Sequence, residues 1–325
     1  MNILVTGGAG YIGSIAVKKL CDLGHNVTVL DNLTKGISEL IDKRALLIEG
    51  DTVDSGCVNK AFEISSPNLV LHFAAYKDAG ESMQNPTQYS HNLKGIINLL
   101  DCIASHKTTK IIFSSTAAVY GNPQYLPIDE EHPTTPINYY GFTKLTSEQL
   151  IQWYSRTHQF KYVILRYFNV IGDGGLNYID PKPSNIAPIL MEVITGKRSE
   201  LQINGNDYNT PDGTCIRDYI DVQDLVRAHI LAIDYDKNDI FNLGTEKGAS
   251  VLDLVKLTEV ASGKVIKKLF RERRAGDPPI LTASSQKAKK LLKWQPLISL
   301  PISLDNMLKA YKIPIKNPES NMETY

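Results

Sequence analysis

The sequence predicts an α/β fold in which a doubly wound, Rossmann-type parallel sheet is followed by a smaller C-terminal α/β domain. The strand-like run Asn2–Thr6 leads directly into a glycine-rich turn and then into a helical pattern that stops near Gly24. Strand-like and helical stretches then alternate up to about residue 170, and the strands are nearly continuous apolar runs. Such strands are typical of a parallel sheet that is covered by helices on both faces.

The glycine-rich turn at residues 7–13 contains Gly7, Gly10 and Gly13. Glycines at this spacing permit a tight turn, close approach of the backbone to a diphosphate, and close packing of the helix on the strand. The N-terminus of the helix favours the negative charge of that diphosphate. A second strand ends at Asp31, where an acid binds a ribose 2′-hydroxyl and repels a 2′-phosphate. This ordered series predicts an NAD site and disfavours a glycine turn that binds no nucleotide.

Four more strands are expected in the first half of the chain, at residues 45–49, 68–73, 110–113 and 162–166. Ligands of parallel sheets bind beyond the C-terminal ends of the strands. At these positions the sequence has small, polar or charged residues, in segments 7–13, 31–32, 50–51, 74–77, 114–116 and 167–169. These segments are therefore the candidate site.

The remainder of the chain is richer in loops. It is expected to contain a long functional loop at 172–188, a short strand and a helix that return to the main sheet at 216–234, a further strand at 241–244, a helix at 251–261, a basic loop at 271–279 and a disordered polar tail at 317–325. We expect residues 1–171 to form the NAD-binding domain, with 212–245 returning to it. Residues 172–325 are expected to form mainly the substrate domain.

Composition excludes several classes of partner. Lys and Arg together number 35, as do Asp and Glu, so the net charge is zero and we expect no binding to nucleic acid or to an anionic membrane. The chain enters its first strand without the features of a signal peptide, and no apolar run is long enough to span a bilayer. The four cysteines and seven histidines show no metal-binding spacing. We expect a cytoplasmic protein with free thiols and no metal.

Tyr140 and Lys144 are the candidate catalytic pair. They are four residues apart, so on a helix both side chains project from one face. A tyrosine has an ordinary pKa of about 10, and it acts as a base near neutral pH only if that pKa falls by about three units. One lysine does not supply so large a shift, whereas a bound nicotinamide cation beside the pair would. The hydroxyl of Thr116, at the end of the fifth strand, completes a proton-transfer set.

Taken together, these motifs resemble those of the extended short-chain dehydrogenase/reductases and, within them, the UDP-glucose 4-epimerases. The likeness extends from residue 1 to about residue 300. It is carried by residues 7–13, 30–33, 80–82, 114–121, 140–144, 165–169, 213–219 and 273–278.

The resemblance implies an isomerase that inverts C4 of a UDP-hexose. Tyr140, as phenolate, removes the proton of the C4 hydroxyl, directly or through Thr116, while a hydride passes to the nicotinamide. The resulting 4-keto sugar turns over in the pocket and receives the hydride on its other face. Because no net redox change occurs, NAD stays tightly bound, and Lys144 also holds the nicotinamide ribose.

The resemblance also implies two sets of binding residues. The cofactor-binding set is Gly7, Gly10, Tyr11, Ile12, Gly13, Asp31, Asn32, Asp51, Phe73, Ala74, Ala75, Lys77, Asn92, Ser114, Tyr140, Lys144 and Tyr167. The substrate-binding set is Thr116, Phe168, Asn169, Asn185, Ile186, Asn204, Arg217, Arg274, Asp277 and Leu281. Arg217 and Arg274 would grip the UDP diphosphate, a task that suits guanidinium groups.

Three positions depart from the family pattern. The catalytic hydroxyl is Thr116, where relatives also frequently have serine, and this change is conservative. Asn204 stands where relatives often have an aromatic residue against the uracil, which puts that stacking in doubt. Leu281 stands at a gate of the sugar pocket. A tyrosine there resembles epimerases restricted to UDP-glucose and UDP-galactose, whereas smaller residues resemble those that also accept N-acetylhexosamines.

Other functions remain open from the sequence. The alternatives within the family are another nucleotide-sugar epimerase, a 4,6-dehydratase and a UDP-glucuronate decarboxylase. The last two place acids after the strand-end hydroxyl, because elimination and decarboxylation need them, whereas here Ala117 and Ala118 follow. A non-catalytic NAD-sensing protein would be expected to lose the Tyr140–Lys144 pair. The family likeness also implies a homodimer through the helices that contain residues 92–100 and 144–153.

Overall fold

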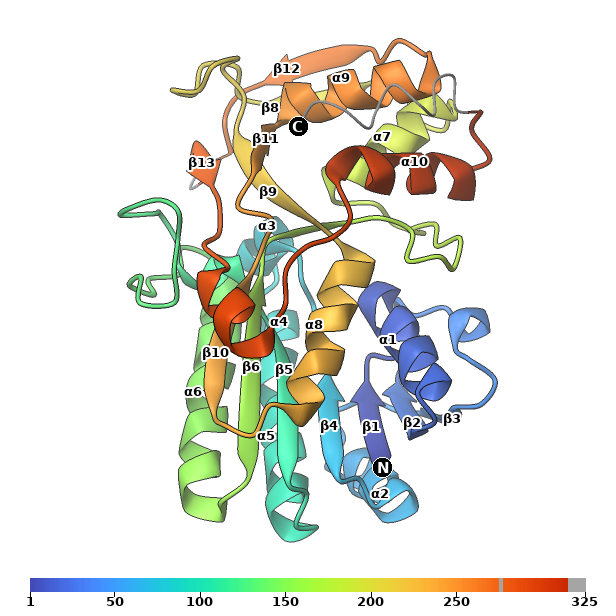
Figure 1. The fold of residues 1–325 in the computed structure, drawn as a ribbon, viewed down its shortest axis with the longest axis vertical. Coiled ribbons are helices and arrows are strands. Elements are labelled where there is room, and N and C mark those ends of the chain that lie inside the picture. The colour runs from blue at the N-terminus through green and yellow to red at the C-terminus, as the bar shows by residue number, and fades with distance from the viewer. Residues whose placement is uncertain (275–276, 315–325) are drawn as a thin grey trace.

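The computed structural model describes residues 1–274 and 277–314. Its main layer is a seven-stranded sheet in which every pair of neighbours is parallel, with the order β10-β6-β5-β4-β1-β2-β3 (Figure 1). The strands are β1 (Asn2–Thr6), β2 (Asn26–Asp31), β3 (Leu46–Glu49), β4 (Leu69–His72), β5 (Lys110–Thr116), β6 (Lys161–Tyr167) and β10 (Asp239–Leu243). The predicted Rossmann-type parallel sheet is confirmed.

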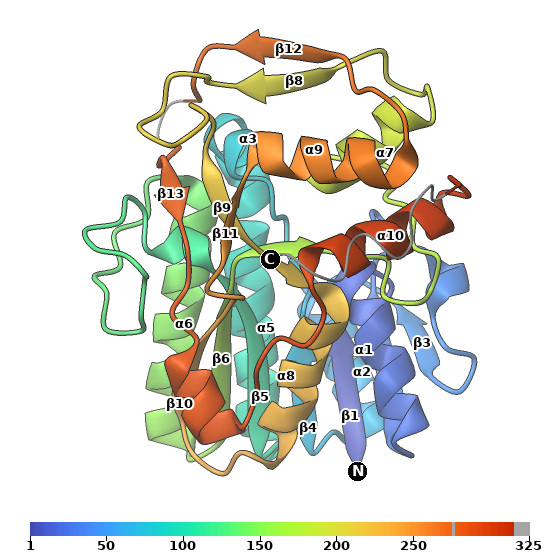
Figure 2. The ribbon, with the colours of Figure 1, turned by 45° about the horizontal axis from the view of Figure 1, so that its top comes forward.

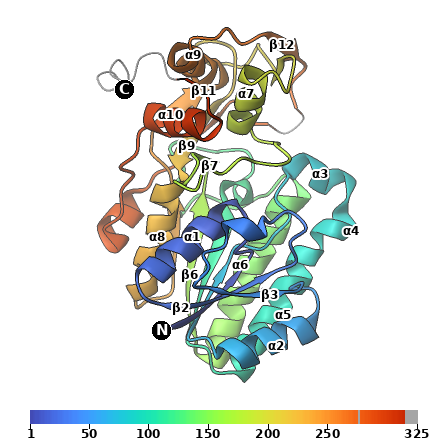
Figure 3. The same ribbon diagram turned by 90° about the vertical axis from the view of Figure 1, so that its right-hand side faces the viewer.

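Helices cover both faces of this sheet (Figure 3). One face is covered by α1 (Tyr11–Asp22) and α8 (Val222–Asp234), and the other by α2 (Ser55–Ser65), α5 (His91–Ser105) and α6 (Tyr139–His158). Along β1, Ile3 and Val5 join the core under α1, whereas Leu4 joins the core under α2. This alternation follows from the two-residue period of a strand, and burial on both sides explains why the strands are apolar throughout.

The C-terminal part lies beyond one end of the sheet (Figure 2). It contains a four-stranded sheet of β7 (Asn169–Ile171), β9 (Ile216–Asp221), β11 (Gly248–Ser250) and β13 (Ile280–Leu281), and a parallel pair, β8 (Leu201–Asn204) and β12 (Lys268–Arg271). The helices α7 (Ile186–Ile194), α9 (Val251–Ser262) and α10 (Leu300–Ala310) pack around a separate apolar core. Shorter elements are η1 (Ser38–Leu40), α3 (Ala79–Gln84), α4 (Pro86–Tyr89), η2 (Ala117–Val119) and η3 (Ala288–Leu292).

The structure corrects two expectations about elements. The strand expected to return to the main sheet, β9, instead pairs with β7, β11 and β13, so only α8 and β10 return. The carboxylate of Asp218 on β9 is buried and accepts hydrogen bonds from the backbone nitrogens of Thr245, just after β10, and of Ala283, just after β13, so β9 lies beyond the end of the main sheet. The strand expected at 110–113 continues to Thr116 as β5. The expected tail at 317–325 lies outside the described residues.

Candidate active site

The glycine turn between β1 and α1 is shaped by close backbone contacts. Gly7 has φ of 73°, and a Cβ placed on it would lie 2.5 Å from the backbone nitrogen of Ala74. A Cβ on Gly13 would lie 2.1 Å from the carbonyl oxygen of Gly7. Only glycine fits at either position, so α1 begins directly against the turn, and the first N–H groups of the helix have no partner within it. A glycine turn at the N-terminus of a helix is a typical binding place for a diphosphate.

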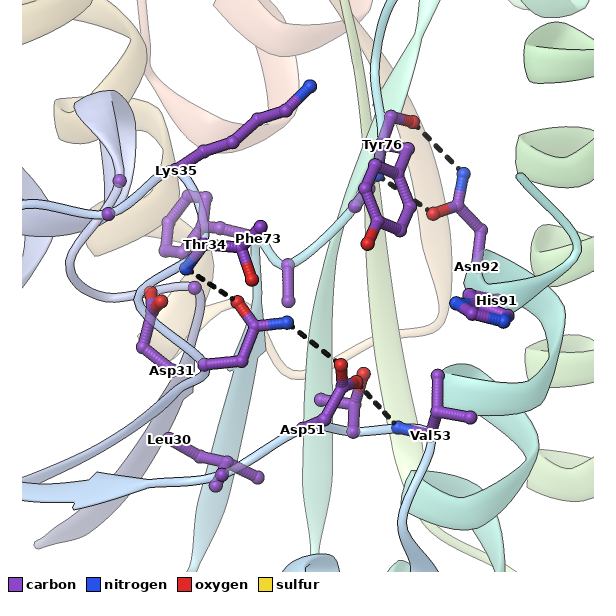
Figure 4. A pocket seen from close by; sticks show the side chains of 18 residues that line it. Leu30, Asp31, Thr34, Lys35, Asp51, Val53, Phe73, Tyr76, His91 and Asn92 are labelled. Carbon is purple, nitrogen blue, oxygen red and sulfur yellow. Dashed lines mark hydrogen bonds between the residues drawn. The ribbon is translucent and has the colours of Figure 1, made fainter. Parts of the chain in front are cut away.

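The turn opens into a pocket at the C-terminal ends of β1, β2 and β4 (Figure 4). Asp31 at the end of β2 accepts hydrogen bonds from the backbone nitrogens of Ala9, at 3.0 Å, and Leu33, at 2.9 Å. Asn32 donates from Nδ2 to Asp51 Oδ2 at 2.8 Å. Both carboxylates therefore line the pocket wall, that of Asp31 bonded by the loop backbone and that of Asp51 by the amide of Asn32.

Nine of the predicted cofactor residues line this pocket, namely Gly7, Gly10, Asp31, Asn32, Asp51, Phe73, Ala74, Ala75 and Asn92. The amide of Asn92 is engaged with the chain, since it bonds both the nitrogen of Tyr76, at 2.9 Å, and its carbonyl oxygen, at 3.0 Å. Asn92 thus fixes the segment after β4. Lys77, in the same segment, is exposed and does not line this pocket.

Some pocket residues were missed in the sequence. Lys35 and His91 line the pocket outside the predicted segments, and the Nζ of Lys35 lies 5.5 Å from the centre of the ring of Tyr76, which belongs to the predicted segment 74–77 (Figure 4). Each follows or precedes a predicted residue by a few positions. Lys35 follows the end of β2 by four residues, and His91 directly precedes Asn92, so their positions could have indicated them. Their residue types form no recognisable pattern.

Tyr140 and Lys144 lie on the first two turns of α6, as their spacing predicts. Asn138 caps this helix, because its side chain accepts a hydrogen bond from the nitrogen of Gly141 at 2.8 Å. A Cβ on Gly141 would lie 2.5 Å from the carbonyl oxygen of Ala118. Glycine at this position lets the start of α6 pack against η2, the turn that directly follows Thr116, and so brings the tyrosine to the end of β5.

The structure does not show the lowered phenol pKa that a base requires. Burial raises the pKa of Tyr140 to about 12, and a hydrogen bond with Thr116 opposes the rise only in part. Burial also lowers the pKa of Lys144 to about 7, against the opposing charge of Glu148. The Nζ of Lys144 donates to the carbonyl oxygen of Ser114 at 2.8 Å. The chain's own groups therefore keep the phenol protonated near neutral pH, and a further positive charge is needed to ionise it.

Strand register places other predicted residues beside this pair. Thr116 on β5 is the register partner of Tyr167 on β6. Ser114, also on β5, bonds the Nε2 of His229 at 2.9 Å, and the other ring nitrogen of His229 lies 2.9 Å from the carbonyl oxygen of Leu225. Since a carbonyl accepts only, Nδ1 carries the proton and Nε2 accepts from Ser114.

A second group of predicted residues gathers where β9 meets β13. Arg217 on β9 forms a 2.7 Å ion pair with Asp277, and its register partner on β13 is Leu281. Leu281 also packs in one apolar cluster with Phe168 and Ala117. The arginine and the gate leucine are thus adjacent, and the leucine reaches the cluster that begins just after Thr116. Asn169, on β7, pairs with β9 two residues beyond Arg217.

The other four predicted substrate residues lie at the ends of elements or in a loop of the C-terminal part. Asn185 and Ile186 lie at the start of α7, and the side chain of Asn185 does not cap the helix. Asn204 ends β8, where its register partner is Arg271. Arg274 is exposed, and its carbonyl oxygen accepts from the nitrogen of Asp277 at 3.2 Å.

Neither a metal site nor a membrane span is found in the described part of the chain. Within residues 1–274 and 277–314, no group of three or more His, Cys, Asp or Glu is placed to hold a metal ion. No helix in the same ranges has both the length and the apolar character needed to cross a bilayer.

Comparison with known proteins finds the same kind of enzyme by family model, by sequence and by fold. Residues 3–244 match the model of the NAD dependent epimerase/dehydratase family. The chain is 42% identical over 304 residues to the UDP-glucose 4-epimerase of Lacticaseibacillus casei, which covers 91% of this chain and 92% of that protein. Its fold matches the Bifidobacterium longum UDP-glucose 4-epimerase in complex with NAD+ and UDP, with a TM-score of 0.90, 37% identity, and coverage of 95% and 98% of the two chains.

A third similar protein broadens the range of sugars among the relatives. The UDP-Glc/GlcNAc 4-epimerase of Campylobacter jejuni matches with a TM-score of 0.84 and 38% identity, covering 95% of this chain and 98% of that one. The family match spans well over half of the sequence, and the relatives cover nearly all of it. The chain therefore belongs to the NAD dependent epimerase/dehydratase family.

Proposed function

We propose that this protein is an isomerase that uses NAD to invert C4 of a UDP-hexose, interconverting UDP-glucose and UDP-galactose through a 4-keto sugar. The observation that carries the proposal is the placement of Tyr140, Lys144 and Thr116 together at one end of the sheet, with the glycine turn and its pocket at the same end. Ala117 and Ala118 form the turn after Thr116, and neither can donate or accept a proton for an elimination.

In this proposal the chain's residues move one proton and hold the reactants. Bound NAD supplies the hydride acceptor and donor for C4, and its positive nicotinamide favours the phenolate of Tyr140. Tyr140 accepts the proton of the C4 hydroxyl, with Thr116 bridging the two oxygens, and returns it after the sugar has turned. Lys144, held against the carbonyl oxygen of Ser114, supports the phenolate and positions the nicotinamide ribose.

Anchoring of the nucleotide is assigned to the region around β9. Arg217 is buried and paired with Asp277, so we propose that the UDP diphosphate shares or takes over this guanidinium when it binds. Arg274, exposed in the following loop, supplies a second guanidinium. A firmly held diphosphate leaves the hexose free to present either face of C4 to the base.

We propose a division of labour along the chain that follows the sheets. Residues 1–171, with α8 and β10 from the segment 212–245, bind the cofactor, whereas β9 of that segment belongs to the C-terminal sheet and its Arg217 to the UDP-sugar. The rest of the chain, 172–211 and onward from 246, mainly binds the UDP-sugar. The cytoplasm is proposed as the compartment, because the four cysteines are all free thiols.

A homodimer through α5 and α6 is also proposed. These helices lie side by side on one face of the sheet (Figure 3). Their outer surface exposes large apolar side chains, with Trp153 at 62%, Phe142 at 47% and Ile97 at 38% exposure. Large apolar side chains exposed on adjacent helices are typical of a surface that a second copy covers.

Acceptance of N-acetylated hexoses is the second candidate activity. Leu281 is half-buried against Phe168 and Ala117, beside the end of β5, and it is smaller than a tyrosine. The relative from Campylobacter jejuni is itself named for both UDP-Glc and UDP-GlcNAc. We propose that the pocket also admits UDP-N-acetylglucosamine and UDP-N-acetylgalactosamine.

The test is turnover of UDP-galactose and of UDP-N-acetylgalactosamine by purified protein, with product sugars separated by chromatography. We expect conversion without added NAD, because a cofactor that is regenerated in each cycle remains bound. Failure to convert either sugar, even with NAD supplied, would contradict the proposed function. Conversion of UDP-galactose alone would remove only the wider sugar range.

A further inference from the structure

A buried ion pair lies one helical turn beyond Lys144, and the proposed chemistry does not use it. Glu148 on α6 is 0% exposed and Arg166 on β6 is 4% exposed. Arg166 donates from Nε to Glu148 Oε1 at 3.0 Å and from Nη2 to Oε2 at 2.6 Å, so the guanidinium grips both carboxylate oxygens. A buried pair of this kind is weak evidence for added stability, because the cost of removing both charges from water offsets their attraction.

Additional hydrogen bonds tie the pair to neighbouring strands. Ser115 on β5 donates its hydroxyl to Glu148, and Arg166 donates from Nη1 to the hydroxyl of Tyr120 at 3.0 Å. Tyr120 in turn donates to Asn242 on β10 at 2.7 Å. All of these side chains are buried. The network therefore fixes α6 against β5, β6 and β10 through oriented bonds. These four elements lie together at one side of the main sheet (Figure 1).

Three members of the network adjoin residues of the candidate site. Glu148 lies one turn after Lys144 on α6, Ser115 lies between Ser114 and Thr116, and Arg166 precedes Tyr167. The network thus joins the helix that carries the base to the two strand ends that carry its partners.

The charges around Lys144 are few. Its Nζ lies 4.7 Å from the centre of the Phe113 ring. Burial lowers the pKa of His72 on β4 to about 3 and of His229 on α8 to about 4, so both are neutral near pH 7. Burial raises the pKa of Tyr140 and of Tyr167 on β6, so both phenols are also neutral. Glu148 supplies the negative charge that favours the ammonium form of Lys144.

We propose that Glu148, held by Arg166 and Ser115, is a positioning residue that keeps Lys144 charged and holds Tyr140 and Lys144 in line with Thr116. This inference rests on the proposed epimerase activity. It gives the buried ion pair a role in maintaining the charge and placement of the catalytic lysine.

The test is the pH dependence of kcat/KM for UDP-galactose in Glu148→Gln. The amide keeps the shape but not the charge, and Arg166 loses its counter-charge, so Lys144 should lose its proton at lower pH. We expect the alkaline limb of the profile to move down by about one pH unit. Glu148→Asp keeps the charge and should restore the limb to its parental position even if kcat falls. Asp224→Asn, which removes an equally buried acid from α8, should lower stability and leave the limb in place.

Two further measurements keep the test decisive. If Glu148→Gln does not fold, the double variant Glu148→Leu/Arg166→Met removes both charges, and its limb should move in the same direction but less far. Acetylation of Lys144 by acetic anhydride, followed by peptide mass spectrometry, should show the amine becoming reactive at lower pH in either variant, and this readout does not require turnover. An unmoved limb and unmoved labelling in a folded variant would overturn the inference. Absent turnover in the parent would instead contradict the proposed function, while labelling would still test the role of Glu148.

Discussion

Tyr140 is the single residue on which the proposed chemistry depends most. Tyr140→Phe removes the proton acceptor but keeps the ring, so turnover of UDP-galactose should fall by about 10²–10⁴-fold with the fold retained. Tyr139→Phe is the matched control, because the hydroxyl of Tyr139 bonds only to Ser90, at 2.7 Å, among the hydrogen bonds of the described residues. Turnover and thermal unfolding should be measured on both. An active Tyr140→Phe variant would remove Tyr140 from the mechanism.

Two glycines of the cofactor turn should respond differently to the same substitution. A Cβ on Gly13 would lie 2.1 Å from the backbone oxygen of Gly7, whereas a Cβ on Gly10 would approach nothing closer than 3.3 Å. Gly13→Ala should therefore destabilise the fold by about 1–3 kcal/mol, as overpacking does, and reduce the NAD that copurifies. Gly10→Ala should keep a melting temperature close to that of the parent. Equal melting temperatures would show that α1 can shift to admit a methyl group.

Arg217 should affect binding more than the chemical step. It lies on β9 and pairs with Asp277, and in the proposed function it binds the diphosphate and takes no part in the proton transfer. Arg217→Met should raise the KM for UDP-galactose by about 10–100-fold, since hydrogen bonds to charged groups contribute about 1.5–3 kcal/mol. The value of kcat should change little. Arg227→Met on α8, which also breaks an arginine–carboxylate pair, is the control and should leave KM unchanged.

At the scale of elements, α5 and α6 are expected to meet a second copy of the chain. Trp153→Glu places a charge on the exposed surface of α6 and should convert the dimer to a monomer, because a charge buried without a partner is costly. Val265→Glu, at a position that is 90% exposed and precedes β12, should leave the assembly unchanged. Light scattering coupled to gel filtration measures both. A monomeric parent, or a dimeric Trp153→Glu variant, would contradict this interface.

The elements that could be predicted are those whose signal is local. Strands β1, β2 and β4 and helix α9 follow from apolar runs, periodicity and glycine stops within one stretch of sequence. Strands β11 and β13 have three and two residues and exist through pairing with β9, so no local pattern marks them. The same holds for the site. The Tyr140–Lys144 spacing is visible in the sequence, whereas the pairing of Glu148 with Arg166 depends on how α6 packs on β6.

At the scale of the whole molecule, the two halves are joined through the candidate site. Leu281 and Ala283 from the C-terminal part share an apolar cluster with Ala117 and Phe168, beside the ends of β5 and β6. The strand β9 carries Arg217, which is proposed to bind the diphosphate, and continues into α8, which packs on the main sheet and carries His229. We therefore expect that a change that destabilises the packing of α8 on the sheet also disturbs the site, because His229 on α8 bonds Ser114.

The pH dependence of stability tests the histidines that lie beneath the site. Burial lowers the pKa of His229 to about 4, below its ordinary value of about 6.5, so the unfolded chain binds a proton over this interval and the folded protein does not. The contribution of neutral His229 to the free energy of unfolding is fully present above pH 6.5 and is lost as the pH falls towards 4. Each such histidine adds about 1.4 kcal/mol per pH unit to the slope of the free energy of unfolding against pH within the interval.

His229→Gln should flatten this slope by that amount in urea unfolding measured from pH 7 to pH 4.5, because glutamine does not titrate. His158→Gln, at an exposed position on α6, should leave the slope unchanged. A parental slope in the His229→Gln variant would mean that His229 titrates alike in the folded and unfolded protein, against the burial and the fixed hydrogen bonds to Ser114 and Leu225.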